Sequence, residues 1–357
     1  MSIRRQFMIF TSLMVVLVMA LLYGISSMVF DGLQKNTAFN YLKTTSHIAE
    51  ELIDRRLDQM SSCSAIAVQA FGLSNAFSSG DEEQLNDCLL FLRQSCPYLS
   101  FALFANQQGG QVAALPGLKE EAALLFSDSI WKLHRSGAST LKTKAVIPLE
   151  NLFAAGTEPL TEYEITLSDG NLLGQALANL TITAVGDSGY LIAGEILNNS
   201  GYYPGSYSAT IDNSYLSISL GNIRVCSNIS SPERDNYLGC PIPDFEDNFT
   251  TTADYYHGVE YAPIGGDYYF SYKAIRDYSG EIIGYLGVGI PERDYKLLLK
   301  SNRTIILAVI LISLPIILIG SWLFCSRITR PIIAGKEISQ KISRGDFSAG
   351  HDYPVPS

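Results

Sequence analysis

The chain has 357 residues, of which 47% are hydrophobic and 17% charged, and its formal net charge at pH 7 is −10. The acidic balance argues against a nucleic-acid partner, because binding to phosphates needs clustered Lys and Arg. The low charged fraction indicates a membrane protein, and the length suggests two or three domains.

The first apolar run covers residues 7–30 and contains no charged residue. A helix rises about 1.5 Å per residue, so a run of this length crosses a hydrocarbon core about 30 Å thick. A cleaved signal peptide is the alternative, but its apolar region is shorter, about 7–15 residues, and no A-x-A site closes this run. We therefore predict an uncleaved transmembrane helix after a short N-terminus, residues 1–6.

A second uncharged run covers residues 304–326 and predicts a second transmembrane helix. Because cytoplasmic flanks carry an excess of Lys and Arg, we expect both chain ends in the cytoplasm and residues 31–303 on the outer side of the membrane. Residues 31–302 hold 17 Lys and Arg against 32 Asp and Glu, so the acidic charge belongs to the external part. The basic residues that flank the two runs are Arg4, Arg5, Arg327, Arg330, Lys336, Lys341 and Arg344.

Residues 31–77 predict a long helix that continues from the first membrane span. Apolar side chains such as Leu42, Ala49 and Leu52 recur at spacings near three and four, and Gly and Pro are absent between Leu33 and Phe71. Such a helix acts as a stalk that carries displacement between an external head and the bilayer. The alternative is a core helix of the head, and the two ends of one helix can do both.

Residues 78–170 predict a sheet covered by helices. Residues 81–96 form an amphipathic helix with Leu85, Cys88, Leu89 and Leu92 on one side. Helix, strand and turn patterns then alternate, which is typical of an antiparallel sheet with helices on its faces. The remaining predicted elements are strands at 98–104, 111–115 and 140–149 and a helix at 119–135.

Residues 171–303 predict a second module of similar type. Of the 20 tyrosines, 15 lie between Tyr190 and Tyr295. A hairpin turn at 276–281 joins the last two strands, and the final strand is apolar on both faces, which places it in the middle of a sheet. A short helix at 292–302 leads into the second span. The predicted strands are 179–184, 190–193, 216–220, 223–229, 268–275 and 282–290.

Segment 216–291 resembles the membrane-proximal part of Cache sensor domains, the extracytoplasmic sensors of bacterial receptors. The matching pieces are residues 222–228, 237–239, 269–277 and 280–291, of which the G-E-I-I-G hairpin with its glycine-bearing strand is the most specific. Residues 78–170 fit as architecture. The resemblance implies an α+β fold with two serial PAS-like antiparallel-sheet modules, a double Cache, on a long N-terminal helix between two transmembrane helices.

The tail, residues 327–357, resembles the first helix of a HAMP relay domain, as found in methyl-accepting chemotaxis proteins and sensor kinases. The matching residues are 327–332, with Pro331 at the helix start, and 343–348, with Gly345 and Asp346 at its end. HAMP domains are dimeric four-helix bundles, so the resemblance implies a homodimer. Because a second HAMP helix and an output domain are missing, we expect a truncated chain; the alternative is an output supplied by a partner.

The sequence contains no catalytic motif that we accept, so we predict a protein that is not an enzyme and has no cofactor. G-D-S-G at residues 186–189 is similar to a serine-protease signature, but between two strands it is better interpreted as a turn. Of the four histidines, only His257 lies in the candidate pocket region, where we interpret it as a polar loop residue. Neither a C-x-x-C motif nor a His/Cys cluster suggests a metal.

Five cysteines lie in the predicted external part, and Cys325 lies in the second span. An oxidising compartment permits disulfides, and the pairs closest in sequence are Cys226 with Cys240 and Cys88 with Cys96. The odd count leaves at least one thiol unpaired in each chain. Buried free thiols are an equal alternative.

The candidate ligand site lies on the strands of the second module. Strand alternation points Arg224, Cys226 and Asn228 to one side of residues 223–229, and an arginine in mid-strand needs a carboxylate or a bound anion as its partner. Lys273, on the strand that carries Tyr269, likewise needs a carboxylate or a bound anion as its partner. Aromatic residues with one or two cations suit a small carboxylate or an amino acid. We predict ligand contacts by Arg224, Asn228, Tyr237, Tyr256, Tyr269 and Lys273; the alternative is that Arg224 pairs internally.

These features predict a transmembrane receptor that binds a small molecule outside and relays a conformational change through HAMP. One alternative is a membrane-anchored envelope enzyme of unrecognised chemistry, and another is a structural or adhesive protein. The basic, proline-bearing segment just inside the membrane favours the receptor, because neither alternative needs a relay helix. The ligand and the output are left open.

Overall fold

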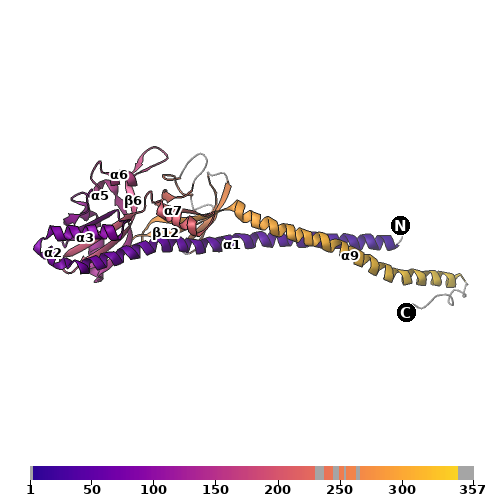
Figure 1. Cartoon of the computed structure of the whole chain (residues 1–357). Helices are drawn as coiled ribbons and strands as arrows, with labels where there is room; N and C mark the ends of the chain where they lie inside the picture. Colours follow the sequence, from indigo (N-terminus) through magenta and orange to yellow (C-terminus); the bar gives the residue numbers. More distant parts are fainter. Residues whose placement is uncertain (1–2, 230–236, 244–248, 253–254, 263–265, 345–357) are drawn as a thin grey trace. The chain divides into compact units, whose positions relative to one another are not determined.

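The computed structural model describes residues 3–229, 237–243, 249–252, 255–262 and 266–344 (Figure 1). The chain divides into two compact units. One unit contains Met1–Asn36 and Lys296–Ser357, and the other is the continuous segment Thr37–Tyr295. The second unit contains the sheets and the candidate site.

Helix α1 is a single helix of 68 residues, Ile3–Ala70. Within it, Ile9–Val29 is long and apolar enough to cross a membrane, and this stretch is not buried in the protein. The predicted stalk is thus continuous with the apolar run. The predicted end at residue 77 is wrong, because Gly72 adopts a left-handed conformation (φ 56°) and begins a separate helix, α2 (Leu73–Ser79). Glycine takes this conformation without the steric cost of a Cβ.

The first sheet is antiparallel and has five strands in the order β2-β1-β7-β6-β3. One face packs against α1, α2 and α3 through an apolar cluster that includes Met60, Leu73 and Leu89. The other face is covered by η1, α4 and α5. The strands are β1 (Phe101–Asn106), β2 (Gln111–Ala114), β3 (Thr140–Pro148), β6 (Gln175–Val185) and β7 (Gly189–Ile196), and the helices are α3 (Glu82–Ser95), η1 (Ala122–Phe126), α4 (Ser127–Ser136) and α5 (Leu149–Leu152).

Helix α3 confirms the predicted amphipathic pattern. Its four predicted apolar positions, Leu85, Cys88, Leu89 and Leu92, are its buried residues. Asp81 caps the N-terminus, where its carboxylate accepts a hydrogen bond from the Gln84 amide at 3.1 Å. The predicted helix 119–135 is instead a 3₁₀ turn, η1, followed by α4.

The boundary between the predicted modules, at residues 170 and 171, does not separate the two sheets. Strands β6 and β7 follow this boundary but pair with β3 and β1 of the first sheet. A short α6 (Glu158–Tyr163) and the two-stranded ribbon β4 (Ile165–Thr166) and β5 (Leu172–Leu173) lie before them. The chain passes to the second sheet only after Ile196, through α7 (Tyr202–Thr210).

The second sheet is antiparallel and has six strands in the order β10-β11-β12-β13-β8-β9. As predicted, β13 lies in its interior, between β12 and β8. The predicted hairpin turn is also present, since the Asp277 carboxylate accepts hydrogen bonds from the backbone amides of Ser279 and Glu281. The strands are β8 (Tyr215–Leu220), β9 (Ile223–Ser227), β10 (Phe249–Thr252), β11 (Tyr255–Ala262), β12 (Gly266–Arg276) and β13 (Ile282–Pro291).

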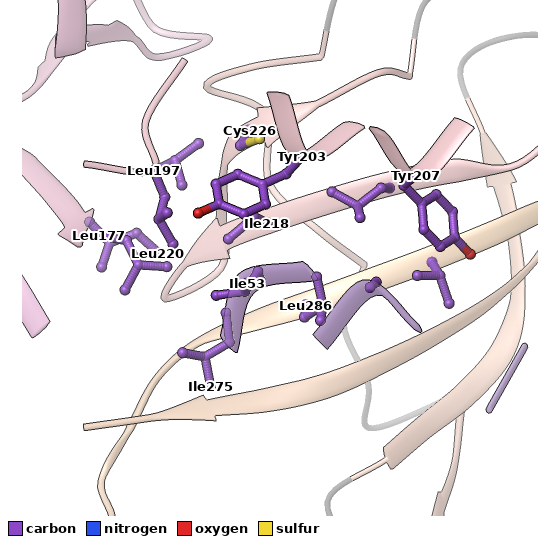
Figure 2. Packing of buried hydrophobic residues seen from close by; sticks show 14 of the residues in the cluster. Ile53, Leu177, Leu197, Tyr203, Tyr207, Ile218, Leu220, Cys226, Ile275 and Leu286 are labelled. Atoms are coloured by element: carbon purple, nitrogen blue, oxygen red, sulfur yellow. The ribbon is translucent and has the colours of Figure 1, made fainter. Parts of the chain in front are cut away.

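One face of the second sheet packs against α1 and α7. Ala38, Leu42, Ala49 and Ile53 of α1 belong to this core, and Figure 2 shows Ile53 with Tyr203, Ile218 and Leu286. Between Ala38 and Ala67, α1 therefore supplies buried residues to both sheets. In this stretch α1 is a core helix, which was the alternative to a stalk.

Strand β13 runs directly into α9, a single helix of 52 residues, Glu292–Ser343. The predicted short helix at 292–302 is thus the start of a longer one, whose described apolar stretch is Leu307–Gly320. The prediction that Pro331 starts a helix is wrong, because Pro331 lies inside α9. A proline removes one backbone N–H, and the helix continues across that single loss. Residues 345–348 of the HAMP-like motif lie outside the described residues.

The cysteines at 63, 88, 96, 226 and 240 lie in the described part of the chain, and neither predicted disulfide fits the fold. Cys226 packs on the α1 face of the second sheet, whereas Cys240 packs with the cluster on the opposite face. Cys88 and Cys96 lie eight residues apart along α3, which separates them by about 12 Å, too far for a disulfide.

Candidate ligand-binding site

The face of the second sheet that points away from α1 is aromatic. Alternate residues of β12, Tyr268, Phe270 and Tyr272, lie on it with Tyr237, Ile229 and Ile242 in one buried cluster. Tyr215, Tyr256 and Tyr285 pack against this cluster. We call this set of residues the tyrosine face. It contains six of the 15 tyrosines that lie between Tyr190 and Tyr295.

Two glycines of β13 make room for the rings. A Cβ atom on Gly287 would overlap the ring of Tyr272, and one on Gly289 would overlap the ring of Phe270. The glycine-bearing strand therefore lets the aromatic side chains of β12 lie flat on the neighbouring strand. The G-V-G spacing that supported the sequence resemblance has a packing reason here.

Arg224 brings a buried cation to the tyrosine face. It lies on β9, is 3% exposed, and donates from Nη1 to the Pro241 carbonyl at 2.6 Å and from Nη2 to the Tyr272 hydroxyl at 3.3 Å. The hydroxyl of Ser219 shares this side, because Ser219 pairs with Arg224 across the ladder. A guanidinium fixed beside phenol groups is a suitable binding group for a carboxylate.

Of the other predicted residues, Tyr237 and Tyr256 also belong to the tyrosine face. Tyr237 is buried in the cluster, and the ring of Tyr256 meets that of Tyr285 edge-on at 5.8 Å. Asn228 serves the backbone: its Oδ1 accepts from the Leu216 amide at 2.8 Å, and its Nδ2 donates to the Ser214 carbonyl. The structure thus brings Arg224, Tyr237 and Tyr256 to one side of the sheet.

Lys273 and Tyr269 share a face, as predicted, but it is the opposite face, toward α1. The Lys273 ammonium lies 2.5 Å from the Glu50 carboxylate of α1 and 5.4 Å from the centre of the Tyr255 ring. Burial disfavours its charge, but Glu50 outweighs burial and holds the pKa of Lys273 above its ordinary value. Tyr269 donates to the Glu292 carboxylate at 3.3 Å. These two residues couple α1 and the start of α9 to the sheet.

His257 also lies on the α1 face. It belongs to β11, is 9% exposed, and packs between the rings of Phe39 and Tyr255. Burial, with Lys43 nearby, holds its pKa below the ordinary value. The interpretation of His257 as a polar loop residue is therefore wrong, because the residues around it form a paired strand.

The predicted alternation in 223–229 fails at a β-bulge. Ile218 pairs with Cys226 and Ser219 pairs with Arg224, so Val225 is an extra residue in β9. Beyond the bulge the sides exchange: Cys226 joins Val225 in the core against α1, and Ile229 joins the tyrosine face. A bulge breaks the period of two on which the prediction depended.

Sequence reasoning missed a buried polar cluster where α1 passes from the first sheet to the second. Arg56 of α1 pairs with Glu195 of β7, whose carboxylate also accepts from the Tyr203 hydroxyl at 2.5 Å and from Asn179 at 3.2 Å. The Arg56 guanidinium lies 3.4 Å from the centre of the Tyr202 ring. We call Arg56, Asn179, Glu195, Tyr202 and Tyr203 the junction cluster.

Burial disfavours the Arg56 charge, but Glu195 outweighs burial and keeps the pKa of Arg56 above its ordinary value. Burial and the Glu195 carboxylate together raise the pKa of Tyr203. A carboxylate inside the otherwise apolar run G-Y-L-I-A-G-E-I was the signal in the sequence. A buried strand tolerates such a group only when it is paired.

Cavities lie around α4, away from the tyrosine face. One, of about 490 Å³, is lined by Asp128, Trp131, Lys132, Arg135, Ser136 and Tyr278. Trp131 is 59% exposed, and Arg135 stacks on it at 4.5 Å. Within the part of the chain that the structure describes, no three His, Cys, Asp or Glu residues gather to hold a metal ion.

No family model matches the chain, and no curated protein matches it either. Similar solved structures include the periplasmic domain of Vibrio cholerae LuxQ, at 12% identity and TM-score 0.42, covering 70% of this chain and 99% of that one. The ligand-binding domain of the Pseudomonas fluorescens chemoreceptor CtaA with L-isoleucine has 10% identity and TM-score 0.41, covering 76% and 97%. That of the Pseudomonas aeruginosa amino acid chemoreceptor PctB with L-Arg has 14% identity and TM-score 0.32, covering 71% and 93%.

Proposed function

We propose that this chain is the sensing and transmitting part of a bacterial transmembrane receptor. Residues 31–303 form its extracytoplasmic double-Cache sensor, two spans cross the inner membrane, and the cytoplasmic part of α9 is the first helix of a HAMP relay in a homodimer. The observation that carries the proposal is continuity. Helix α1 joins an apolar run to the core of both sheets, and β13 joins the six-stranded sheet to α9 without an intervening loop.

This continuity supports a receptor because a change in the sheets can reach both helices through few contacts. Lys273 of β12 binds Glu50 of α1, and Tyr269 of the same strand binds Glu292 at the start of α9. Both side chains lie on the face of the sheet that is opposite to the tyrosine face. A ligand that moves β12 from one side therefore acts on both helices from the other.

The ligand is a small carboxylate or an amino acid bound at the tyrosine face. Arg224 supplies the cation, and Tyr237, Tyr256 and Tyr272 supply rings and hydroxyl groups. Such a combination of one buried charge with aromatic walls gives orientation through the charge and affinity through the apolar area. Lys273 acts as a coupling residue, and Asn228 supports the β8–β9 ladder.

The test is a thermal-shift screen of the full chain in lipid nanodiscs against L-amino acids and small organic acids, with isothermal titration of the hits. We expect Arg224→Met to weaken a carboxylate hit by about 10–100-fold, because a charged hydrogen bond contributes roughly 1.5–3 kcal/mol. The matched control is Arg276→Met on the same strand as Tyr272, where the guanidinium is exposed and donates to the Gly280 carbonyl.

Binding that Arg224→Met leaves as tight as in the wild type would contradict the site. If Trp131→Ala abolishes the same binding instead, the ligand occupies the cavity beside α4. Thermal unfolding of each unliganded variant distinguishes a lost contact from a lost fold. A hit that is turned over to a product would favour the envelope-enzyme alternative.

A further inference from the structure

The largest cavity beside α4 lies between this helix and the turn that joins β12 to β13. Helix α4 turns its buried residues toward the first sheet, and the cavity is on its other side. The residues of α4 that form this wall recur at spacings of three and four, as one face of a helix requires. Tyr278 of the turn forms the opposite wall. We call this space, lined by Asp128, Trp131, Lys132, Arg135, Ser136 and Tyr278, the α4 cavity.

Both cations of the α4 cavity lie against aromatic rings rather than against carboxylates. The Lys132 ammonium is 4.9 Å from the centre of the Tyr278 ring, and the Arg135 guanidinium is 4.5 Å from that of Trp131. Within the part of the chain that the structure describes, neither cation forms an ion pair. Like charges three positions apart on a helix repel each other. An anion that contacts both cations would therefore be stabilised here.

We propose that the α4 cavity is a second ligand site, which binds a small aromatic carboxylate. The carboxylate accepts hydrogen bonds from the forked Arg135 guanidinium and from the Lys132 ammonium. The ligand ring packs beside Trp131, which is 59% exposed, and beside Tyr278. The cavity volume of about 490 Å³ lies within the range of small-molecule sites, about 300–1,000 Å³. This site is separate from the tyrosine face.

The third charge of the α4 cavity determines how the ligand's sign can be tested. Asp128 is exposed and lies one turn before Lys132 on the same face of the helix. Two cations and one carboxylate leave the cavity with a net positive charge, which favours an anion. Asp128 itself repels that anion, whereas it would attract a ligand that binds through an ammonium group. Removal of the Asp128 charge therefore has opposite effects on the two kinds of ligand.

A bound ligand would also join elements of the two sheets. Helix α4 packs on the first sheet, whereas Tyr278 belongs to the turn that the Asp277 carboxylate holds between β12 and β13. An adjoining cavity of about 200 Å³ shares Asp128 and Tyr278 and continues along β3. A carboxylate in the α4 cavity therefore restrains the β12–β13 hairpin against the first sheet.

The intrinsic fluorescence of Trp131 reports binding directly. The chain has two tryptophans, Trp131 and Trp322, so in the Trp322→Phe variant all tryptophan emission comes from the α4 cavity. We expect titration of this full chain in nanodiscs with phenylacetate to give a saturable change of emission. Phenylacetamide, which has the same ring but no charge, and acetate, which has the charge but no ring, should each bind at least tenfold more weakly.

Substitutions in the same background test the role of each charge. Lys132→Met and Arg135→Met should each raise the Kd for phenylacetate by about tenfold, because each removes a charged hydrogen bond. Asp128→Asn should lower the Kd by about threefold, since it removes a repulsive charge. The matched control is Lys119→Met, an exposed lysine that does not line the cavity, and it should leave the Kd unchanged.

An absent saturable response, or an equal response to phenylacetamide, would overturn the proposal. A Kd that Lys132→Met and Arg135→Met leave unchanged, or that Asp128→Asn raises, would do the same. Thermal unfolding of each unliganded variant verifies that the fold is retained. These variants all lie outside the tyrosine face, so the tests of the two sites can fail independently.

Discussion

At the scale of residues, the two cations that the sequence singled out have different roles. Alternation along β12 correctly places Lys273 and Tyr269 on one face. It does not reveal that Arg224 points to the other face, because the side on which one strand places a residue depends on its register with the next strand. The bulge at Val225 also changes the face on which the following residues lie, and the alternation within one strand does not predict a bulge.

His257 gives the stability of the fold a pH dependence that can be measured. The pKa of His257 is lower in the native state than in the unfolded chain. At a pH between the native pKa and about 6.5, His257 is therefore protonated in the unfolded chain but neutral in the native state. Stability from this residue is present above about pH 6.5 and is lost as the pH falls through the native pKa. We expect His257→Gln to reduce the fall in melting temperature between pH 7.5 and pH 5.

The exposed His134 provides the control, and His134→Gln should retain the wild-type pH dependence. Melting curves of the full chain in nanodiscs at intervals of half a pH unit are sufficient. If His257→Gln and the wild type lose the same number of degrees between these pH values, His257 is not the group that titrates.

At the scale of elements, the sequence predicted the features that depend on the spacing of neighbouring apolar residues. The spacing of apolar residues correctly predicted the buried side of α3. The apolar residues on both faces of β13 correctly predicted its place inside the sheet. The prediction that β6 and β7 belong to the second module is wrong. Strand β7 pairs with β1, which lies about 90 residues earlier, and the sequence of a single strand does not indicate which strand it pairs with. The helix break at Gly72 depended on a backbone conformation rather than on an apolar pattern.

The junction cluster should be the most sensitive polar contact in the unit Thr37–Tyr295. Glu195→Gln leaves the Arg56 cation buried without its carboxylate, which costs about 3–5 kcal/mol and lowers the melting temperature by on the order of 10 °C. Glu51→Gln is the matched control: it removes the same charge from the Arg55–Glu51 pair of the same helix, whose side chains are 69% and 60% exposed.

For Glu51→Gln we expect a change within about 2 °C, since exposed pairs contribute little. The full chain in nanodiscs serves for both melting experiments. Equal melting temperatures for the two variants would show that the junction cluster has no special part in joining α1 to the first sheet.

At the scale of the whole molecule, two long helices connect apolar runs to the sheets. The sequence indicated the runs and the amphipathic helix between them, and the structure adds that each helix is unbroken through its junction with the sheets. Two side chains of β12 connect the sheet to these helices: Lys273 binds Glu50 of α1, and Tyr269 binds Glu292 of α9. A receptor needs such a connection, and neither an anchored enzyme nor an adhesin does.

Hydrogen exchange of the full chain in nanodiscs, with and without the best carboxylate or amino-acid hit, tests the proposed receptor function most directly. We predict slower exchange at the tyrosine face, in β9 and β12, together with a change of exchange rate in the part of α9 between Arg327 and Ser343. The second change should disappear in Tyr269→Phe, which removes the hydroxyl that binds Glu292 at the start of α9, while ligand binding persists. Slower exchange confined to the residues around α4, or protection at the tyrosine face with α9 unchanged, would contradict the account.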